Sequence, residues 1–272
     1  MSETTLAEGI RYTITAGVAT LTFERPERHN AMDPAMRTRY GKVLREAEQD
    51  PAVRAVVVTG NGRSFCPGAD LEALAGIGTT GVADEDLAAE DGGHADVLAA
   101  ATVAKPVVAA INGGCAGLGF VVACAADVRF AAAGAKFTTA FVRRGLIAEY
   151  GIAKLLPELV GRGRALDLLL SGRTFTAEQA LDYGLVQEVL PPDELLAAAT
   201  AYAGELATYS APRSMALIKE QLRVEAALPL AESARRATGL MIDSFGHPEL
   251  AEGVRSWNER RPPAFPPYPS ES

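Results

Sequence analysis

Side chains that bind metal ions or form disulfides are scarce in this sequence of 272 residues. The three cysteines are an odd number and show neither C-x-x-C spacing nor a nearby histidine, which disfavours both a disulfide framework and a metal site. The three histidines follow no pattern of metal ligands or of a catalytic triad. We therefore expect buried free thiols and no bound metal. The residues concerned are Cys66, Cys115, Cys124, His29, His94 and His247.

Positive charge and long apolar runs are also lacking. The formal net charge is -8, which argues against a surface built for polyanions, so no nucleic-acid partner is expected. No uninterrupted apolar segment approaches the roughly 20 residues of a membrane-spanning helix. The first residues, MSETTLAEGI, contain no basic region followed by an apolar run, as a secretory signal would. We expect a cytoplasmic protein that does not enter a membrane.

What the sequence does contain is typical of a folded α/β protein. Residues 10–23 alternate as two strands joined near Ala16 and Gly17, and Asp33-Pro34 predicts the start of a helix. The apolar runs 55–60 and 106–111 predict strands covered on both faces. Later segments have helical spacing, with a capping box at Thr176 and Gln179 and a short strand in residues 184–189. We expect a core over residues 1–195 and a C-terminal helical region over 196–272 that ends in a Pro-rich tail.

A glycine-rich loop follows the strand at 106–111. Its sequence, NGGCAGLGF, does not fit a dinucleotide fingerprint, because Val122 occupies the third glycine position, and it lacks the lysine of a phosphate-binding loop. The remaining pattern is a strand, a glycine turn and the start of an apolar helix. Such a turn lets backbone N–H groups approach a ligand, and the helix dipole favours negative charge there. The loop is therefore predicted to hold an oxyanion.

A second loop of this kind, GNGRSFCPGADLEAL, follows the strand at 55–60. The two loops together, with RPERHNAM, RRGLIAEYGIAKLLPELVG and SGRTFTAEQALDYGLV, resemble the crotonase, or enoyl-CoA hydratase/isomerase, family over most of the chain. The resemblance implies a spiral of ββα units with a C-terminal helical region that assembles trimers or dimers of trimers. It also implies an acyl-CoA thioester as substrate, so that coenzyme A is part of the substrate and no separate cofactor is needed. The backbone N–H groups of Ala69 and Leu118 would then hold the thioester oxygen.

The same resemblance locates the candidate acids. The two positions at which hydratases of the family carry glutamates are occupied by Val121 and Phe141, which cannot transfer protons. Glu149 stands where related isomerases carry their acid, so it is the predicted acid/base in the isomerisation of a 3-enoyl-CoA to a 2-enoyl-CoA. Two alternatives stay open: a hydratase with an atypical acid/base set, and a non-enzymatic CoA-thioester-binding protein. Glu149 could also be only a first-turn acid of a helix beginning near Tyr150.

Other residues of these motifs are predicted to surround the substrate. Arg28 and Arg63 flank the recognisable motifs and could meet the phosphates of coenzyme A. The alternative is that they only solvate a surface, as arginines often do. Packing is the alternative for Cys66, and capping of a helix from Leu71 is the alternative for Asp70. Residues 72–98 are expected to line the acyl pocket, Arg143 and Arg144 to serve subunit contacts or ion pairs, and Trp257 and Phe265 to pack the C-terminal helix. The predicted substrate-binding set is Arg28, Arg63, Cys66, Gly68, Asp70, Gly117, Val121 and Phe141.

Overall fold

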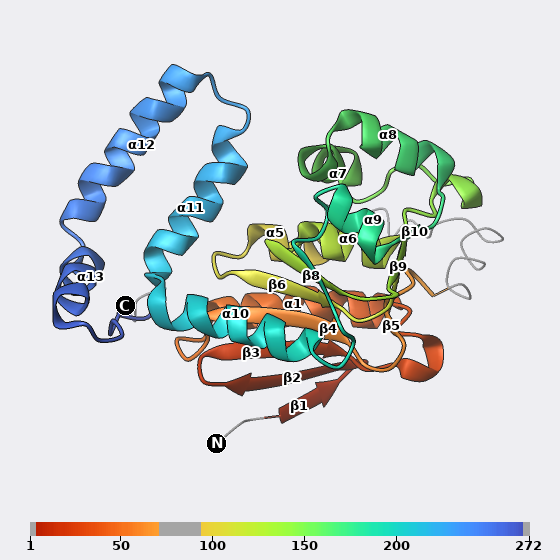
Figure 1. Cartoon of the computed structure of the whole chain (residues 1–272), viewed down its shortest axis with the longest axis horizontal. Helices are drawn as coiled ribbons and strands as arrows, with labels where there is room; N and C mark the ends of the chain where they lie inside the picture. Colours follow the sequence, from red (N-terminus) through yellow and green to blue (C-terminus); the bar gives the residue numbers. More distant parts are fainter. Residues whose placement is uncertain (1–3, 71–93, 269–272) are drawn as a thin grey trace.

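The computed structural model describes residues 4–70 and 94–268 of the chain (Figure 1). The predicted helix from Leu71 lies outside the described residues, as does most of the segment 72–98 that was assigned to the acyl pocket. In the described part, two sheets and their covering helices form the core, and three helices near the C-terminus extend from it (Figure 1). The predicted α/β class is confirmed.

The larger sheet has seven strands in the order β1-β2-β3-β4-β6-β8-β11. Strands β1 to β3 are antiparallel, and the predicted turn at Ala16 and Gly17 joins β2 to β3. From β3 onward the strands run parallel, because each is reached by a crossover through other elements. The strands are β1 (Thr4–Ala7), β2 (Ile10–Thr15), β3 (Val18–Phe23), β4 (Ala55–Gly60), β6 (Val107–Ile111), β8 (Val128–Ala132) and β11 (Glu188–Leu190).

Helices cover both faces of this sheet. Val56 and Val58 of β4 face the cluster that contains helix α1 (Pro34–Gln49), whereas Ala55 and Val57 face helix α10 (Leu195–Tyr209). This alternation follows from the two-residue period of a strand. Both apolar runs predicted as doubly covered strands are buried, so that prediction is confirmed. Asp33 caps α1 as expected, since its side chain accepts the N–H of Met36 at 2.8 Å.

The smaller sheet has four strands in the order β10-β9-β7-β5, of which β5, β7 and β9 run parallel. Consecutive strands alternate between the two sheets: β4 is followed by β5, β6 by β7 and β8 by β9. This pairing of one long and one short strand is the ββα repeat that the resemblance implied. The four strands are β5 (Ser64–Cys66), β7 (Gly114–Ala116), β9 (Lys136–Thr138) and β10 (Phe175–Thr176).

Short helices close the core around the smaller sheet. The predicted capping box is present at the start of α9, where Thr176 and Gln179 bond reciprocally. The short strand predicted in residues 184–189 is shifted, because residues 184–187 turn out of α9 before β11 begins at Glu188. The elements are η1 (Pro26–Arg28), α4 (His94–Val97), α5 (Ala99–Thr102), α6 (Leu118–Ala125), η2 (Val142–Arg144), α7 (Ile152–Val160), α8 (Arg162–Ser171) and α9 (Ala177–Asp182).

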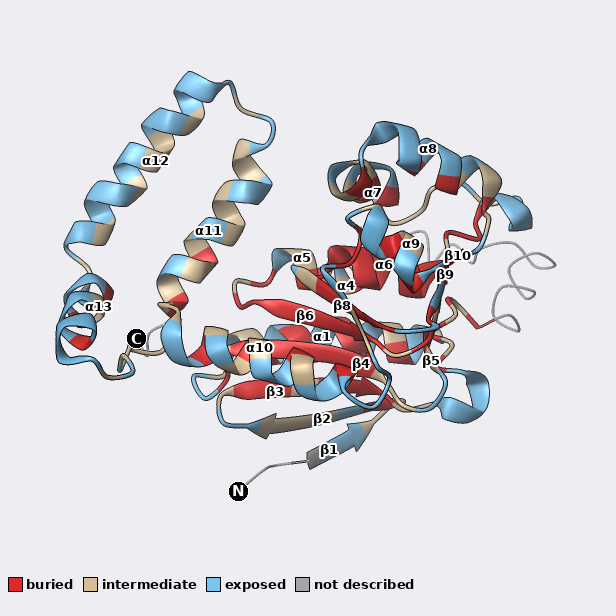
Figure 2. Ribbon diagram, viewed as in Figure 1, coloured by how far each residue is buried: buried red, intermediate tan, exposed pale blue. Residues whose placement is uncertain are grey.

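Helices α11 (Pro212–Glu225), α12 (Leu230–Phe245) and α13 (Pro248–Glu259) form an arm that projects from the end of α10 (Figure 1). The core boundary predicted at residue 195 coincides with the start of α10, but α10 itself packs on the larger sheet. The arm is largely exposed (Figure 2). Trp257 is 84% exposed, so its predicted packing on the helix is wrong for this chain, whereas Phe265 does lie against α13 at Gly253.

Among the helices of residues 4–70 and 94–268, none is long and apolar enough to cross a membrane.

Candidate active site

Both predicted backbone donors lie at one edge of the smaller sheet. Ala69 follows the end of β5, Leu118 follows the end of β7, and these two strands are parallel neighbours. Carboxyl ends of parallel strands meet at the same edge of a sheet, so the two loops are brought together. Phe141 follows β9, the next parallel strand, and the loop before it is joined to this edge where the Gly117 N–H donates to the Thr138 carbonyl at 3.2 Å. Three loops thus share one edge.

Close contact between the first two loops depends on glycine. At Gly68, with φ +114°, a β-carbon would lie 3.4 Å from the Leu118 nitrogen and 3.2 Å from the Ala116 carbonyl oxygen. At Gly119 a β-carbon would lie only 2.2 Å from the carbonyl oxygen of Cys66, so any larger residue would push the loops apart. The two glycines therefore let Leu118 and the peptide after Gly68 approach each other.

Helix α6 begins at Leu118 without a capping side chain. Its N-cap is Gly117, and the first hydrogen bond within the helix runs from the Val121 N–H to the Gly117 carbonyl. The N–H groups before Val121 therefore have no partner within the helix, and the helix dipole makes this end electropositive. The geometry can accept a carbonyl oxygen that develops negative charge.

A segment that the sequence did not point to supports the Ala69 loop. Residues 30–33, called the strap below, run beside it, and Met32 forms a parallel β-bridge with Ala69. Asn30 anchors the strap: its Nδ2 donates to the carbonyls of Asn61 and Ser64, and its Oδ1 accepts the N–H of Arg25. The motif RPERHNAM contains these residues, but no periodicity in it indicates a pairing with a loop some 37 residues away.

The two hydratase positions hold apolar side chains in the structure as in the sequence. Val121 is fully buried in α6, and Phe141 is 4% exposed in the loop after β9. Neither can carry a proton, so the described part of this edge lacks the usual hydratase pair.

Glu149 is half-buried in the segment between η2 and α7. Burial raises the pKa of its carboxyl above the usual value, which makes it a stronger base when ionised. Helix α7 begins at Ile152, two residues after Tyr150, with its N-cap at Gly151. Glu149 therefore precedes the helix. Leu146 and Tyr150 pack on the core beside it, whereas Ile147 is 80% exposed.

The remaining predicted binding residues differ in their surroundings. Arg28 in η1 and Arg63 before β5 are exposed and lie in neighbouring loops, since a β-carbon at Gly62 would be 3.2 Å from that of Pro26. Asp70 is buried, with one oxygen 3.6 Å from an Arg25 nitrogen. Arg143 donates to the Ser171 carbonyl, an internal bond, and the subunit contacts expected of Arg143 and Arg144 stay a prediction.

The cysteines are buried free thiols, as expected. Cys66 and Cys115 are opposite each other in the pairing of β5 with β7, and burial raises the pKa of the Cys66 thiol to about 12. A thiol of such high pKa is not a nucleophile at neutral pH. Within residues 4–70 and 94–268, no three His, Cys, Asp or Glu side chains are grouped as ligands of a metal ion.

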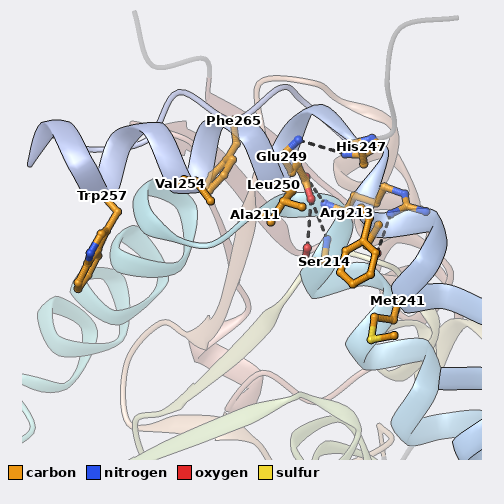
Figure 3. Close-up of a pocket in the computed structure, with 13 residues that line it drawn as sticks. Ala211, Arg213, Ser214, Met241, His247, Glu249, Leu250, Val254, Trp257 and Phe265 are labelled. Atoms are coloured by element: carbon orange, nitrogen blue, oxygen red, sulfur yellow. Dashed lines mark hydrogen bonds between the residues drawn. The ribbon is translucent and has the colours of Figure 1, made fainter. Parts of the chain in front are cut away.

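A separate groove of about 540 Å³ lies at the base of the arm, and none of the predicted site residues lines it (Figure 3). Apolar side chains such as Phe245, Trp257 and Phe265 dominate its wall. At its centre the buried Glu249 of α13 accepts the N–H groups of Arg213 and Ser214, and so caps α11 from a distant helix (Figure 3). This groove belongs to the junction of the arm helices and not to the edge described above.

Alternation of strands between two sheets, with glycine loops that present backbone donors at one edge, defines a protein of the crotonase class. The model of the enoyl-CoA hydratase/isomerase family matches residues 13–267, and the chain belongs to this family. It is 35% identical over 256 residues to a 1,2-epoxyphenylacetyl-CoA isomerase of Escherichia coli, and the match covers 92% of this chain and 95% of that protein. An enoyl-CoA hydratase of Alternaria alternata is 34% identical over 92% of this chain and 83% of its own length.

The fold is likewise similar to solved structures. The crystal structure of an enoyl-CoA hydratase from a Polaromonas species matches with a TM-score of 0.87 and 30% identity, over 94% of this chain and 99% of that one. Relatives with isomerase and hydratase names are therefore both similar to this chain over nearly its whole length.

Proposed function

We propose that the protein isomerises a 3-enoyl-CoA to the 2-enoyl-CoA, with Glu149 as the single proton carrier. Glu149 removes a proton from C2, the electron pair is delocalised onto the thioester oxygen as an enolate, and the same carboxyl returns the proton to C4 while the double bond moves between C2 and C3. Atoms balance without a second reactant or a cofactor other than the coenzyme A of the substrate. Removal of a C2 proton requires stabilisation of the enolate oxygen.

The backbone N–H groups of Ala69 and Leu118 supply that stabilisation in this proposal. Their loops touch at Gly68 and follow adjacent parallel strands. Removing one comparable donor costs on the order of 3 to 4 kcal/mol in the transition state. Because the donors are backbone groups, side-chain substitution at either position leaves them in place.

The proposal rests on the partly buried carboxyl of Glu149. Its pKa is raised by burial, and the two positions that would supply a hydratase pair are apolar and buried. A base of raised pKa also predicts an acid limb in kcat/KM that lies above the pKa of an ordinary glutamate, because only the ionised carboxylate removes the C2 proton.

Glu149→Gln tests the role directly. The variant keeps the side-chain shape but cannot titrate, so kcat with a 3-enoyl-CoA should fall by about 100-fold or more while the affinity for acetoacetyl-CoA stays within about twofold. Turnover is followed by the gain of conjugated enoyl-CoA absorbance. Glu158→Gln on α7 is the matched control, since that glutamate is paired with Lys154 on the surface. Parent-like turnover by Glu149→Gln would exclude this mechanism.

A second isomerisation is favoured by one comparison. The Escherichia coli relative is named a 1,2-epoxyphenylacetyl-CoA isomerase, so that thioester belongs in the substrate panel as the alternative isomerase substrate. Crotonyl-CoA tests the hydratase alternative, which predicts loss of conjugated absorbance on water addition. Binding of acyl-CoA without any turnover would favour the non-enzymatic alternative, and undetectable acetoacetyl-CoA binding at about millimolar concentration would exclude all of these functions.

A further inference from the structure

The peptide unit that joins Gly68 to Ala69 has its direction set from outside its own loop. In a planar trans peptide the carbonyl and the N–H point in opposite directions. The Gly68 carbonyl accepts the N–H of Met32 at 2.9 Å, so the Ala69 N–H of the same peptide points away from Met32. The next peptide is fixed as well, because the Asp70 N–H donates to the Met32 carbonyl at 2.9 Å. The strap therefore aims the Ala69 N–H.

The strap is in turn held by Arg25. One terminal nitrogen of its guanidinium, Nη1, donates to the Ala31 carbonyl at 2.8 Å and lies 2.8 Å from an oxygen of Asp33. The other, Nη2, lies 3.6 Å from an oxygen of Asp70. One side chain thus connects the strap, the N-cap of α1 and the residue directly after Ala69.

The surroundings of Arg25 show that its side chain is fitted into the fold. Its stem lies against Gly9, where a β-carbon would be 2.8 Å from the Arg25 Cδ. Its side chain is 20% exposed, so the ion pairs are only partly screened by water. A guanidinium presents several donors in a fixed fork, which suits three acceptors in different directions better than the single nitrogen of lysine does.

We propose that Arg25 is a positioning residue that orients the Ala69 N–H toward the thioester oxygen. This inference rests on the proposed function, because it assigns Arg25 a role in stabilising the enolate. In this role Arg25 acts through the strap and through Asp70 and needs no contact with the substrate. Loss of its bonds lets the strap and the segment 68–70 shift relative to Leu118, so that the two donors no longer converge on one oxygen.

Arg25→Gln provides the test. Misplacing a preorganised group costs about 10- to 100-fold in rate, so kcat with the 3-enoyl-CoA should fall by that factor while KM changes less than about twofold. Binding is measured with two CoA thioesters. Acetoacetyl-CoA, which resembles the enolate, should lose about 10-fold in affinity relative to butyryl-CoA, which cannot form a conjugated enolate. A purely structural role of Arg25 would lower the thermal midpoint without changing this ratio.

Three further variants sharpen the test. Arg11→Gln is the control, because Arg11 pairs with Glu24, the residue before Arg25, and does not bond to the strap. Asp33→Asn keeps an N-cap acceptor for α1 but removes the carboxylate charge that pairs with Arg25. It should therefore lower kcat less than Arg25→Gln does. Arg25→Lys should recover part of kcat, since one ammonium can satisfy only some of the acceptors.

The possible results are distinct. An unchanged kcat and an unchanged affinity ratio in a folded Arg25→Gln variant overturn the positioning role and leave the proposed function intact. A parent protein that binds neither thioester overturns the proposed function and this inference together. A lowered ratio with parent-like kcat also counts against the inference, because the oriented N–H would then not act in turnover.

Discussion

Helices α10 and α12 are nearly equal in length, at 15 and 16 residues, yet they bury very different surfaces. In α10 the residues Leu195, Ala199, Ala203 and Ala207 recur every four positions and face the larger sheet. In α12 no residue is buried, and even its apolar residues Leu230, Ile242 and Phe245 are 85%, 59% and 63% exposed. In the part of the chain that the structure describes, the stripe of α10 packs on the larger sheet, whereas the apolar side chains of α12 named above remain exposed.

The contrast supports the prediction that the arm contacts another chain. Isolated exposed apolar residues are ordinary, but several on consecutive helices form a contiguous surface of the kind that interfaces cover. Trp257 and Val254 on α13 line the same groove as Phe245 and are 84% and 56% exposed. We therefore keep the prediction that the protein forms a homotrimer or a dimer of trimers through the arm.

The largest expected effect comes from a charge placed in the core. Val57→Asp puts a carboxylate between β4 and α10, where Val57 is fully buried among apolar side chains. An unpaired buried charge costs several kcal/mol, enough to abolish the folded state of a typical domain. Circular dichroism and thermal unfolding of the purified variant measure this. A cooperative transition at the parent temperature would contradict the description of this layer.

The corresponding change in the arm should affect assembly instead. Ile242→Glu combined with Phe245→Glu adds two charges to the exposed face of α12 and leaves no buried cavity. We expect the helical content to be retained and the molar mass to fall to that of one chain, as measured by light scattering. Lys154→Glu, an exposed change on α7, is the control. A parent protein that is monomeric at working concentration would remove the reason for the comparison.

Local elements of the core were predictable because their signals are contained in short windows. The Asp33 cap, the capping box at Thr176 and the apolar runs of β4 and β6 each depend on neighbouring residues. The strands of the smaller sheet were implied by the resemblance but not by periodicity, because strands of two or three residues such as β10 and β7 contain too few positions to show a period. Exposure of Trp257 was missed for a different reason, since apolarity alone does not say which chain covers a residue.

The candidate site was predictable to a similar extent. Its glycine loops are visible in sequence, and their approach follows from parallel pairing of β5 and β7. The Met32 bridge to Ala69 and the Arg25 contacts join residues far apart in the chain, so no spacing rule indicates them. The raised pKa of Glu149 depends on burial, which the sequence could only suggest.

Glu249 connects the arm to the core end of α11, and its removal should have a moderate effect. Glu249→Ala leaves the N–H groups of Arg213 and Ser214 without their acceptor, which costs about 1 to 2 kcal/mol for a lost helix cap. Hydrogen exchange should accelerate in the first turn of α11 and in α13 but not in β4. Glu232→Ala, an exposed first-turn residue of α12, is the control. Uniform acceleration across the sheet would show that the cap stabilises the whole molecule and not the arm.

The smallest expected effect separates two kinds of carboxylate. In the arm, Glu252 accepts bonds from Arg255, Arg261 and the Ala264 N–H, which hold its pKa below the usual range. In the segment before α7, partial burial raises the pKa of Glu149, so ionisation of Glu149 opposes folding. Below the ordinary glutamate pKa, Glu149 is protonated in both folded and unfolded chains and makes no difference. As the pH rises, the unfolded chain loses its proton first, and the free energy of unfolding falls until the folded carboxyl has also ionised.

Glu149→Gln should therefore be slightly more stable than the parent at pH 7, by less than about 1 kcal/mol, and equally stable near pH 4. Glu252→Gln should be less stable than the parent at pH 7, because it loses the charge that its arginines bind. Thermal unfolding of both variants across this pH range checks the signs, and a destabilised Glu149→Gln at pH 7 would show that the carboxylate is stabilised by a partner rather than opposed by burial.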